Sequence, residues 1–302
     1  MADIQCGVSI RAGDIDHVMA IEALGFDSVW TGEHMLFYGP VTDGLITLAA
    51  FAGKTSRLKI GSAINLLPLR PPVVVAKAVS TLDLISNGRF IFGIGVGGEF
   101  PKEFEACGVP HHERGRRANE AIEICRKLWT EEHVTYQGKI FQLHDVTMLP
   151  KPVQPGGPPI IVSGRSEAAI RRAALLGDGY MPYLFTPERF ADGLRKIHTI
   201  ARAQRRDMSR FTPYSFVFTA IGQTHEEAHR VAVEKLSHRY NQAFETLVER
   251  YCAVGTPEEC GARLQRFVDA GARHLILSPL CDAEALGEHL EIYAREILPR
   301  FR

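Results

Sequence analysis

Apolar runs and helical apolar stripes alternate along most of this chain. The clearest unit spans residues 58–99, where an apolar run, a helical stripe over 71–85 and a second apolar run follow one another. Two prolines open the stripe and Ser86-Asn87-Gly88 closes it, as is typical of helix starts and ends. Strand, helix and strand in this order predict two parallel strands, because parallel neighbours need a crossover connection.

The same rhythm continues on both sides of this unit. Six more strands are predicted, at 4–10, 28–34, 160–162, 178–183, 214–221 and 274–278. Helices are predicted between them, at 14–24, 45–53, 114–130, 167–176, 188–205, from 256 to Gly271 and at 283–297, with a polar helical region from 225 to about 251. Eight strands alternating with helices predict an α/β fold, a (β/α)8 TIM barrel, which occupies about 250 residues. Ligands of such barrels lie at the carboxyl end of the strands, where residues 61–65 and 97–99 fall.

Residues 131–159 interrupt the rhythm. They contain a predicted hairpin around Gln137-Gly138-Lys139, followed by the proline-rich run LPKPVQPGGPP. We interpret the segment as an insertion on the barrel rim after the fourth βα unit, although a domain linker has the same composition. The βα rhythm resumes at once, which favours a single barrel domain over 1–302.

Composition narrows the function. The chain has 302 residues, 45% of them hydrophobic, and a net charge of zero, so nothing favours binding to nucleic acid or to an anionic membrane surface. No apolar run is long enough to predict a membrane span, and the start does not resemble a secretory signal. The six cysteines are scattered without metal or disulfide spacing. We expect a cytoplasmic protein with no metal site that acts on a small molecule.

A glycine-rich motif ends the second strand of the central unit. Residues 93–98 match G-x-G-x-x-G, the dinucleotide-binding fingerprint, but that motif needs a helix to begin directly after the first strand. Here the motif follows the fourth predicted strand, and the segment EFPKEFEACGVP precedes the next predicted helix. The favoured interpretation is that the glycines let the strand bend and let a ligand approach.

Two residues at predicted carboxyl strand ends could transfer protons. His34 ends the second strand, and its ordinary pKa near 6.5 suits proton transfer at neutral pH. Glu99 lies at the same end of the barrel, two strands away. The segment from Ser163 to Ser166 joins a strand to a helix start and carries Arg165, so it could bind phosphate, while Ser166 could equally be an ordinary helix cap.

The motifs together resemble the bacterial luciferase-like flavin-dependent oxidoreductases. The resemblance rests on GFDSVWTGEH, on the region from RLKIGSAINLLPLR to PHHERG, and on VSGRSEAAIRRAALLGDGY. It covers nearly the whole chain and is closest to the branch that uses the deazaflavin coenzyme F420, although members that use FMN share most of these motifs. It implies a (β/α)8 barrel with an insertion and a flavin at the carboxyl end of the strands.

The resemblance also assigns site residues. It implies a bulge with a non-prolyl cis peptide within Ser62-Ala63-Ile64, supporting the ring. His34 and Glu99 are the implied catalytic residues. The implied cofactor-binding residues are Glu33, Gly61, Ser62, Ala63, Ile64, Gly97, Gly98, Gly164, Arg165 and Ser166.

The leading hypothesis is an oxidoreductase that passes a hydride between F420 and a small organic substrate. An FMN monooxygenase that uses oxygen is the rival enzyme, and a non-catalytic flavin-binding barrel or a metal-dependent lyase are readings from other classes. The family implies a homodimer or higher homo-oligomer. The residues after His34 match no pattern tied to one substrate.

Overall fold

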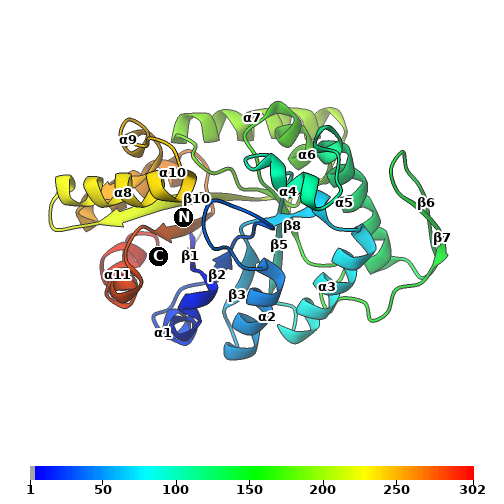
Figure 1. Ribbon diagram of the computed structural model, residues 1–302, viewed down its shortest axis with the longest axis horizontal. Coiled ribbons are helices and arrows are strands. Elements are labelled where there is room, and N and C mark those ends of the chain that lie inside the picture. The colour runs from blue at the N-terminus through cyan, green and yellow to red at the C-terminus, as the bar shows by residue number, and fades with distance from the viewer. Residues whose placement is uncertain (1–3) are drawn as a thin grey trace.

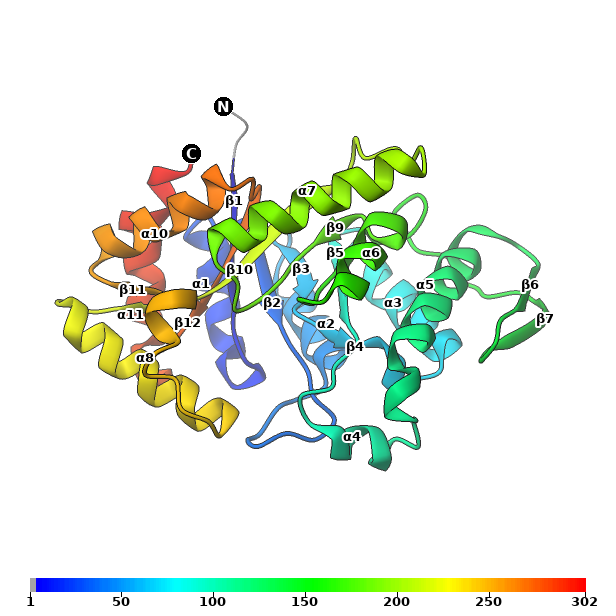
Figure 2. The same cartoon turned by 90° about the horizontal axis from the view of Figure 1, so that it is seen from above.

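A closed ring of eight parallel strands forms the centre of the protein (Figures 1 and 2), in a computed structural model that describes residues 4–302. Neighbouring strands pair in chain order, β9 pairs with β10, and the last strand pairs with the first, which closes the barrel. The predicted TIM barrel is therefore confirmed. Its strands are β1 (Gln5–Ser9), β2 (Ser28–Thr31), β3 (Lys59–Ser62), β5 (Phe90–Gly95), β8 (Ile160–Val162), β9 (Gly179–Tyr180), β10 (Thr212–Ile221) and β12 (His274–Pro279).

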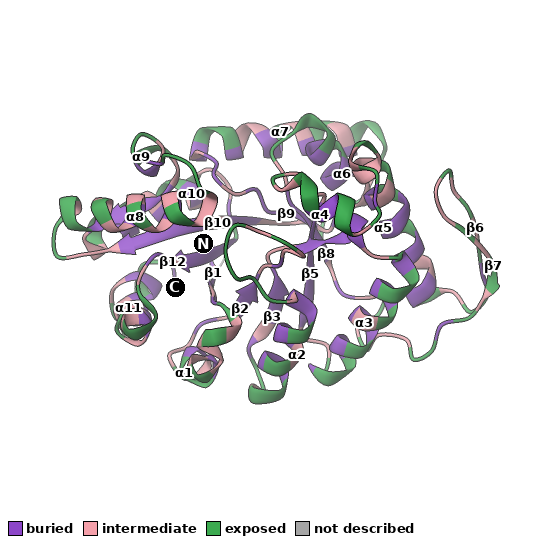
Figure 3. Cartoon of the chain, in the orientation of Figure 1, coloured by how far each residue is buried: buried purple, intermediate pink, exposed green. Residues whose placement is uncertain are grey.

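Helices surround this ring and turn their buried faces toward it (Figure 3). The longer ones match the predicted helices closely, and a capping box opens α10, with Thr256 and Glu259 bonded to each other's backbone N–H groups. The helices are α1 (Val18–Ala23), α2 (Gly44–Lys54), α3 (Pro72–Ile85), α5 (Arg114–Thr130), α6 (Glu167–Leu176), α7 (Pro187–Ala203), α8 (His225–Tyr240), α10 (Pro257–Asp269) and α11 (Leu286–Ile292).

Short elements were missed by the sequence pattern. They are the strands β4 (Asn65–Leu66) and β11 (Ala253–Gly255) and the helix α4 (Pro101–Ala106), whereas the short helix α9 (Val248–Tyr251) lies at the end of the predicted polar helical region. Each of these elements has six residues or fewer, which is too short for a hydrophobic periodicity to be recognised in the sequence. The most consequential is α4, because it lies in the segment after the glycine motif and carries Glu103.

The segment between α5 and β8 forms a separate antiparallel hairpin, β6 (Val134–Gln137) and β7 (Gln142–Val146), which projects from the side of the molecule (Figure 1). The buried Glu120 carboxylate holds the hairpin turn by accepting hydrogen bonds from the N–H groups of Lys139, Ile140 and Phe141, each at 3.0 Å. The hairpin at this place was predicted; the turn carboxylate was not.

Side chains fill the amino-terminal half of the barrel. Trp30 donates to Ser28 Oγ at 2.7 Å, and Ser28 Oγ lies 2.6 Å from His274 Nε2, while Tyr214 stacks on the His274 ring. All four side chains are buried. Because this layer closes the barrel from below, a ligand has room only near the carboxyl ends of the strands.

No helix within residues 4–302 is long and apolar enough to cross a membrane. Within the same range, no cluster of three or more histidine, cysteine, aspartate or glutamate side chains could hold a metal ion.

Burial in this layer lowers the pKa of His274 to about 3. The unfolded chain therefore binds a proton on His274 between about pH 6.5 and pH 3, and the folded chain does not, so this residue costs stability as pH falls through that window. We expect His274→Gln to weaken the pH dependence of the unfolding free energy by up to about 1.4 kcal/mol per pH unit, measured by urea denaturation from pH 7 to pH 4.

The exposed His238→Gln variant is the control and should keep the wild-type slope. An unchanged slope in His274→Gln would mean that the His274 ring already carries a proton in the folded protein.

Candidate functional site

A backbone bulge between β3 and β4 lies at the carboxyl end of the barrel. Its peptide bond between Ala63 and Ile64 is cis, where the family resemblance implied one. The strand beside it has glycines where the bulge approaches: a Cβ on Gly93 would lie 1.9 Å from Ser62 O, and one on Gly95 would lie 2.3 Å from Ile64 Cδ1. The first two glycines of the motif therefore make room for the protein's own bulge, which accounts for them without a dinucleotide fold.

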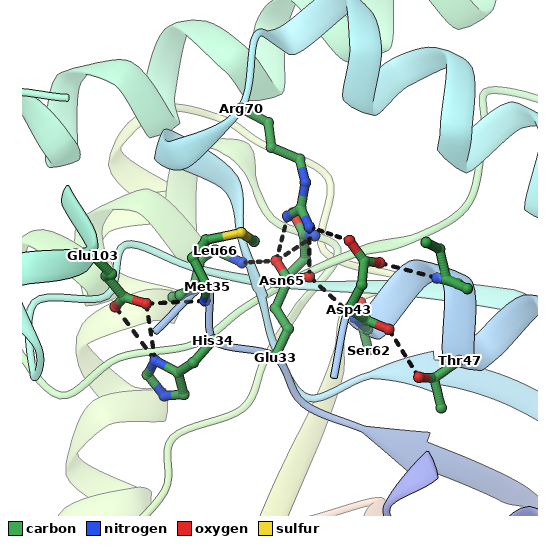
Figure 4. Close-up of polar contacts among 12 residues, drawn as sticks. Glu33, His34, Met35, Asp43, Thr47, Ser62, Asn65, Leu66, Arg70 and Glu103 are labelled. Atoms are coloured by element: carbon green, nitrogen blue, oxygen red, sulfur yellow. Dashed lines mark hydrogen bonds and ion pairs between the residues drawn. The ribbon is translucent and has the colours of Figure 1, made fainter. Parts of the chain in front are cut away.

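The carboxylate of Glu33 anchors this bulge from behind (Figure 4). Its side chain is fully buried and forms an ion pair with Arg70, at 2.6 Å between Oε1 and Nη1. Arg70 also pairs with Asp43, which caps α2 by accepting from the N–H of Ile46. The remaining donors to the Glu33 oxygens are Asn65 Nδ2 at 2.7 Å, Leu66 N at 2.8 Å and Gly44 N at 3.2 Å.

This geometry corrects the expectation for Glu33. The residue was predicted to bind the cofactor, but five protein donors occupy its carboxylate and water does not reach it. Its physical role is to fix the two residues that follow the bulge. The other predicted residues here lie in or beside the bulge: the Ser62 hydroxyl donates to Gly93 O at 2.8 Å, and Gly61 leaves room for the Trp30 ring.

The neighbouring residue, His34, points to a different partner. Its Nδ1 lies 3.2 Å from Oε2 of Glu103, which is fully buried and also accepts from Met35 N (Figure 4). The Phe37 ring stacks on the imidazole at 4.0 Å. A buried carboxylate on one ring nitrogen and an aromatic face fix the orientation of the ring, while 18% of the His34 side chain stays exposed.

Glu103 was not predicted. It lies 69 residues from His34 in the sequence, on a two-turn helix with no hydrophobic period. The Pro101 at the start of that helix was its one available signal.

Glu99 lies in the charge field of the same site. Its side chain is exposed, yet protein on several sides desolvates the carboxylate and raises its pKa; the charges of His34 and Arg165 oppose this rise, and that of Glu103 adds to it. The structure thus brings together three residues predicted separately, from the ends of β2, β5 and β8. An acid of raised pKa beside a fixed histidine is an arrangement suited to proton transfer.

Gly97 and Gly98 have positive φ angles of 63° and 121°. Because Gly98 has no side chain, there is room beside it for two side chains that the sequence pattern did not single out. A Cβ on Gly98 would meet Arg114 Nε at 3.1 Å and His111 Nε2 at 3.2 Å. Both nitrogen atoms are buried without a hydrogen-bond partner.

The predicted phosphate loop follows β8. Gly164 has a φ of 133° and packs against Ala169, while Arg165 is exposed with its guanidinium 5.1 Å from the Tyr183 ring. Ser166 caps α6 by accepting from Ala169 N at 3.2 Å. The cap reading of Ser166 is therefore correct, and it is compatible with an anion at this helix start.

Comparison with known proteins places this site in a family. The model of the luciferase-like monooxygenases matches residues 12–274. The chain belongs to the luciferase-like monooxygenase family.

Relatives of this luciferase-like chain include two enzymes named F420-dependent glucose-6-phosphate dehydrogenase. That of Intrasporangium calvum is 28% identical, over 95% of this chain and 94% of its own; that of Microbacterium testaceum is 29% identical, over 95% and 93%. Among solved structures, monooxygenase RslO1 from Streptomyces bottropensis aligns with a TM-score of 0.86 and 25% identity, covering 99% of this chain and 100% of its own. An F420-dependent secondary alcohol dehydrogenase shares the fold, with a TM-score of 0.88 at 21% identity and 99% of each chain covered.

The Glu33 network gives a stability prediction. Removing one partner of a buried ion pair leaves the other charge unpaired, which costs about 3–5 kcal/mol. We expect Glu33→Ala to lower the free energy of unfolding by this amount in urea denaturation. Glu188→Ala, which breaks a pair with 67% and 56% exposed side chains, is the matched control and should cost less than about 1 kcal/mol. Equal losses in the two variants would contradict the anchoring role.

Proposed function

We propose that this protein is an oxidoreductase that binds a flavin-type cofactor, with F420 favoured over FMN, at the carboxyl end of the barrel. The observation that carries the proposal is the pairing of the bulge at Ala63–Ile64 with a fixed, partly exposed histidine, His34, in the loop after the adjacent strand β2. When bound, reduced F420 supplies a hydride to an organic substrate. The protein's own groups supply binding, orientation and proton transfer.

The residues present fit the anionic part of such a cofactor. The start of α6 offers free N–H groups and Arg165, and unpaired nitrogens of His111 and Arg114 face the space beside Gly98. Buried nitrogens without partners are costly, and a phosphate oxygen would satisfy them. We infer that Arg114 and His111 belong to the cofactor site together with Gly97, Gly98, Gly164, Arg165 and Ser166.

His34 is the proposed group that gives or takes the substrate proton. Its Nδ1 is held by the Glu103 carboxylate, so Nε2 is the nitrogen left for the substrate. Glu103 acts through His34 and is therefore a positioning residue. Glu99, with its raised pKa, keeps a proton to higher pH than an ordinary glutamate and is the second candidate for proton transfer or substrate binding.

Cofactor choice is supported by the relatives. Both curated relatives described above are named as F420-dependent enzymes, whereas RslO1 is named a monooxygenase. Because RslO1 is named a monooxygenase, an FMN monooxygenase stays the rival function.

Fluorescence titration of the purified protein with F420 and with FMN tests the proposal. We expect F420 to bind more tightly than FMN, and Arg114→Ala to weaken F420 binding by roughly tenfold or more, because a charge-assisted contact is lost. Arg230→Ala, an exposed residue of α8, should bind like the wild type. Tight FMN binding with rapid oxygen-dependent reoxidation in stopped flow, and no F420 binding, would favour the rival monooxygenase.

Two variants then separate the proposed catalytic and positioning roles. With a substrate found by screening, His34→Ala should lower kcat by roughly 10²–10⁴ while cofactor affinity is kept. Glu103→Gln should shift the pH profile of kcat and Glu103→Asp should restore part of it. A His34→Ala enzyme with wild-type kcat would rule out proton transfer by this residue.

We also propose that the protein is a homodimer or higher homo-oligomer in the cytoplasm. Large apolar side chains on the outer faces of α2 and α3 are exposed, among them Ile46, Val74 and Ile85, and exposed apolar patches mark interaction sites. The cysteines are unpaired among the described residues, in keeping with a reducing compartment. Analytical ultracentrifugation should give an oligomer that Val74→Asp weakens and that Thr199→Asp, on exposed α7 surface, leaves intact. A monomeric wild type would contradict this part of the proposal.

A further inference from the structure

Aromatic rings extend from His34 toward the end of α8. Phe37 stacks on the His34 ring, Tyr240 meets Phe37 edge-on at 6.1 Å between ring centroids, and Phe218 lies 6.3 Å beyond Tyr240. Phe218 is buried, but Phe37 and Tyr240 are half-buried and so keep ring surface open. These rings come from the loop after β2, from α8 and from β10, so a flat apolar molecule could pack where the three elements meet.

Arg239 lies at the far end of this row and forms no ion pair with a carboxylate of residues 4–302. The guanidinium carbon of Arg239 is 5.4 Å from the centroid of the Phe218 ring. Desolvation lowers the pKa of Arg239, Tyr240 opposes this shift, and the nearby positive charge of Arg11 adds to it. Arg11 follows β1 at the same carboxyl end of the barrel, so its positive charge adds to that of Arg239 there.

Arg239 differs in this respect from Arg70 and Arg165. Arg70 is neutralised by Glu33 and Asp43, and the charge of Arg165 acts on Glu99. A desolvated cation beside a like charge is unfavourable unless an anion approaches it. Its contact with Phe218 and its place in the last turn of α8 compensate part of that cost in the free protein.

We propose that the substrate of this site is a molecule with a flat apolar body and an anionic group. The anionic group, a carboxylate or a phosphate, binds Arg239 with the added charge of Arg11. The apolar body lies against Phe37 and Tyr240, which directs its other end toward His34. This inference rests on the proposed function for the role of His34 in proton transfer. The anion subsite is argued from Arg239 and Arg11 and does not depend on that role.

A matched pair of ligands tests the subsite. The probes are 4-oxo-4-phenylbutanoate and butyrophenone, two aryl ketones that differ in the carboxylate, titrated by calorimetry into protein saturated with its oxidised cofactor. The carboxylate ligand should bind the wild type at least about tenfold more tightly, which corresponds to about 1.4 kcal/mol. Adding the phosphate analogue phenyl phosphate as a competitor distinguishes the two anion types.

Variants locate the preference. Arg239→Gln should bring the affinity ratio of the two ketones to about one while leaving butyrophenone binding unchanged, and Arg239→Lys should keep part of the ratio. Arg230→Gln, from the exposed side of the same helix, should keep all of it. Phe37→Ala should weaken both ligands by a similar factor.

The outcomes separate this inference from the proposed function. A preference for the carboxylate ligand that depends on Arg239 supports the inference. If the protein with bound cofactor shows no turnover, that result counts against the proposed function alone. A ratio near one in the wild type, a ratio unchanged in Arg239→Gln, or no binding of either ketone would overturn the inference.

Discussion

The buried carboxylate of Glu33 is the interaction on which the site depends. A charge in the barrel wall is tolerable only because five N–H donors surround it. Two belong to the guanidinium group of Arg70, and the others are from Asn65, Leu66 and Gly44. Those donors belong to the segment that follows the bulge and to the start of α2. One carboxylate therefore connects the loop after β2, the start of α2 and the segment after the bulge. It also fixes the backbone next to His34.

Two carboxylates near His34 have different surroundings. Glu103 is fully buried and bonded to Nδ1 of His34, so it fixes the ring. Glu99 is exposed but desolvated enough to raise its pKa, so it can hold a proton where an ordinary glutamate would have lost it. This difference in environment comes from the protein itself and does not depend on the identity of the substrate.

Much of the fold was predictable because its long elements carry strong periodicity. The bounds of α5, α6 and β8 agree with the sequence prediction, and the resemblance correctly implied the cis peptide at Ala63. The site was predictable only in part. Adjacent residues such as Glu33 and His34 face different partners, and no local pattern tells which one is buried. The partner of His34, Glu103, lies on a helix too short to have a period, and the importance of Arg114 appears only from unpaired atoms in three dimensions.

The central claim is that the cofactor ring lies between the bulge and His34. A crystal structure of the protein soaked with F420 tests it most directly. The account predicts ring density against the Ala63–Ile64 peptide on one face, with the His34 imidazole on the substrate side and the phosphate near Arg114 and Ser166. Density for the ring elsewhere on the barrel, with His34 remote from it, would contradict the account.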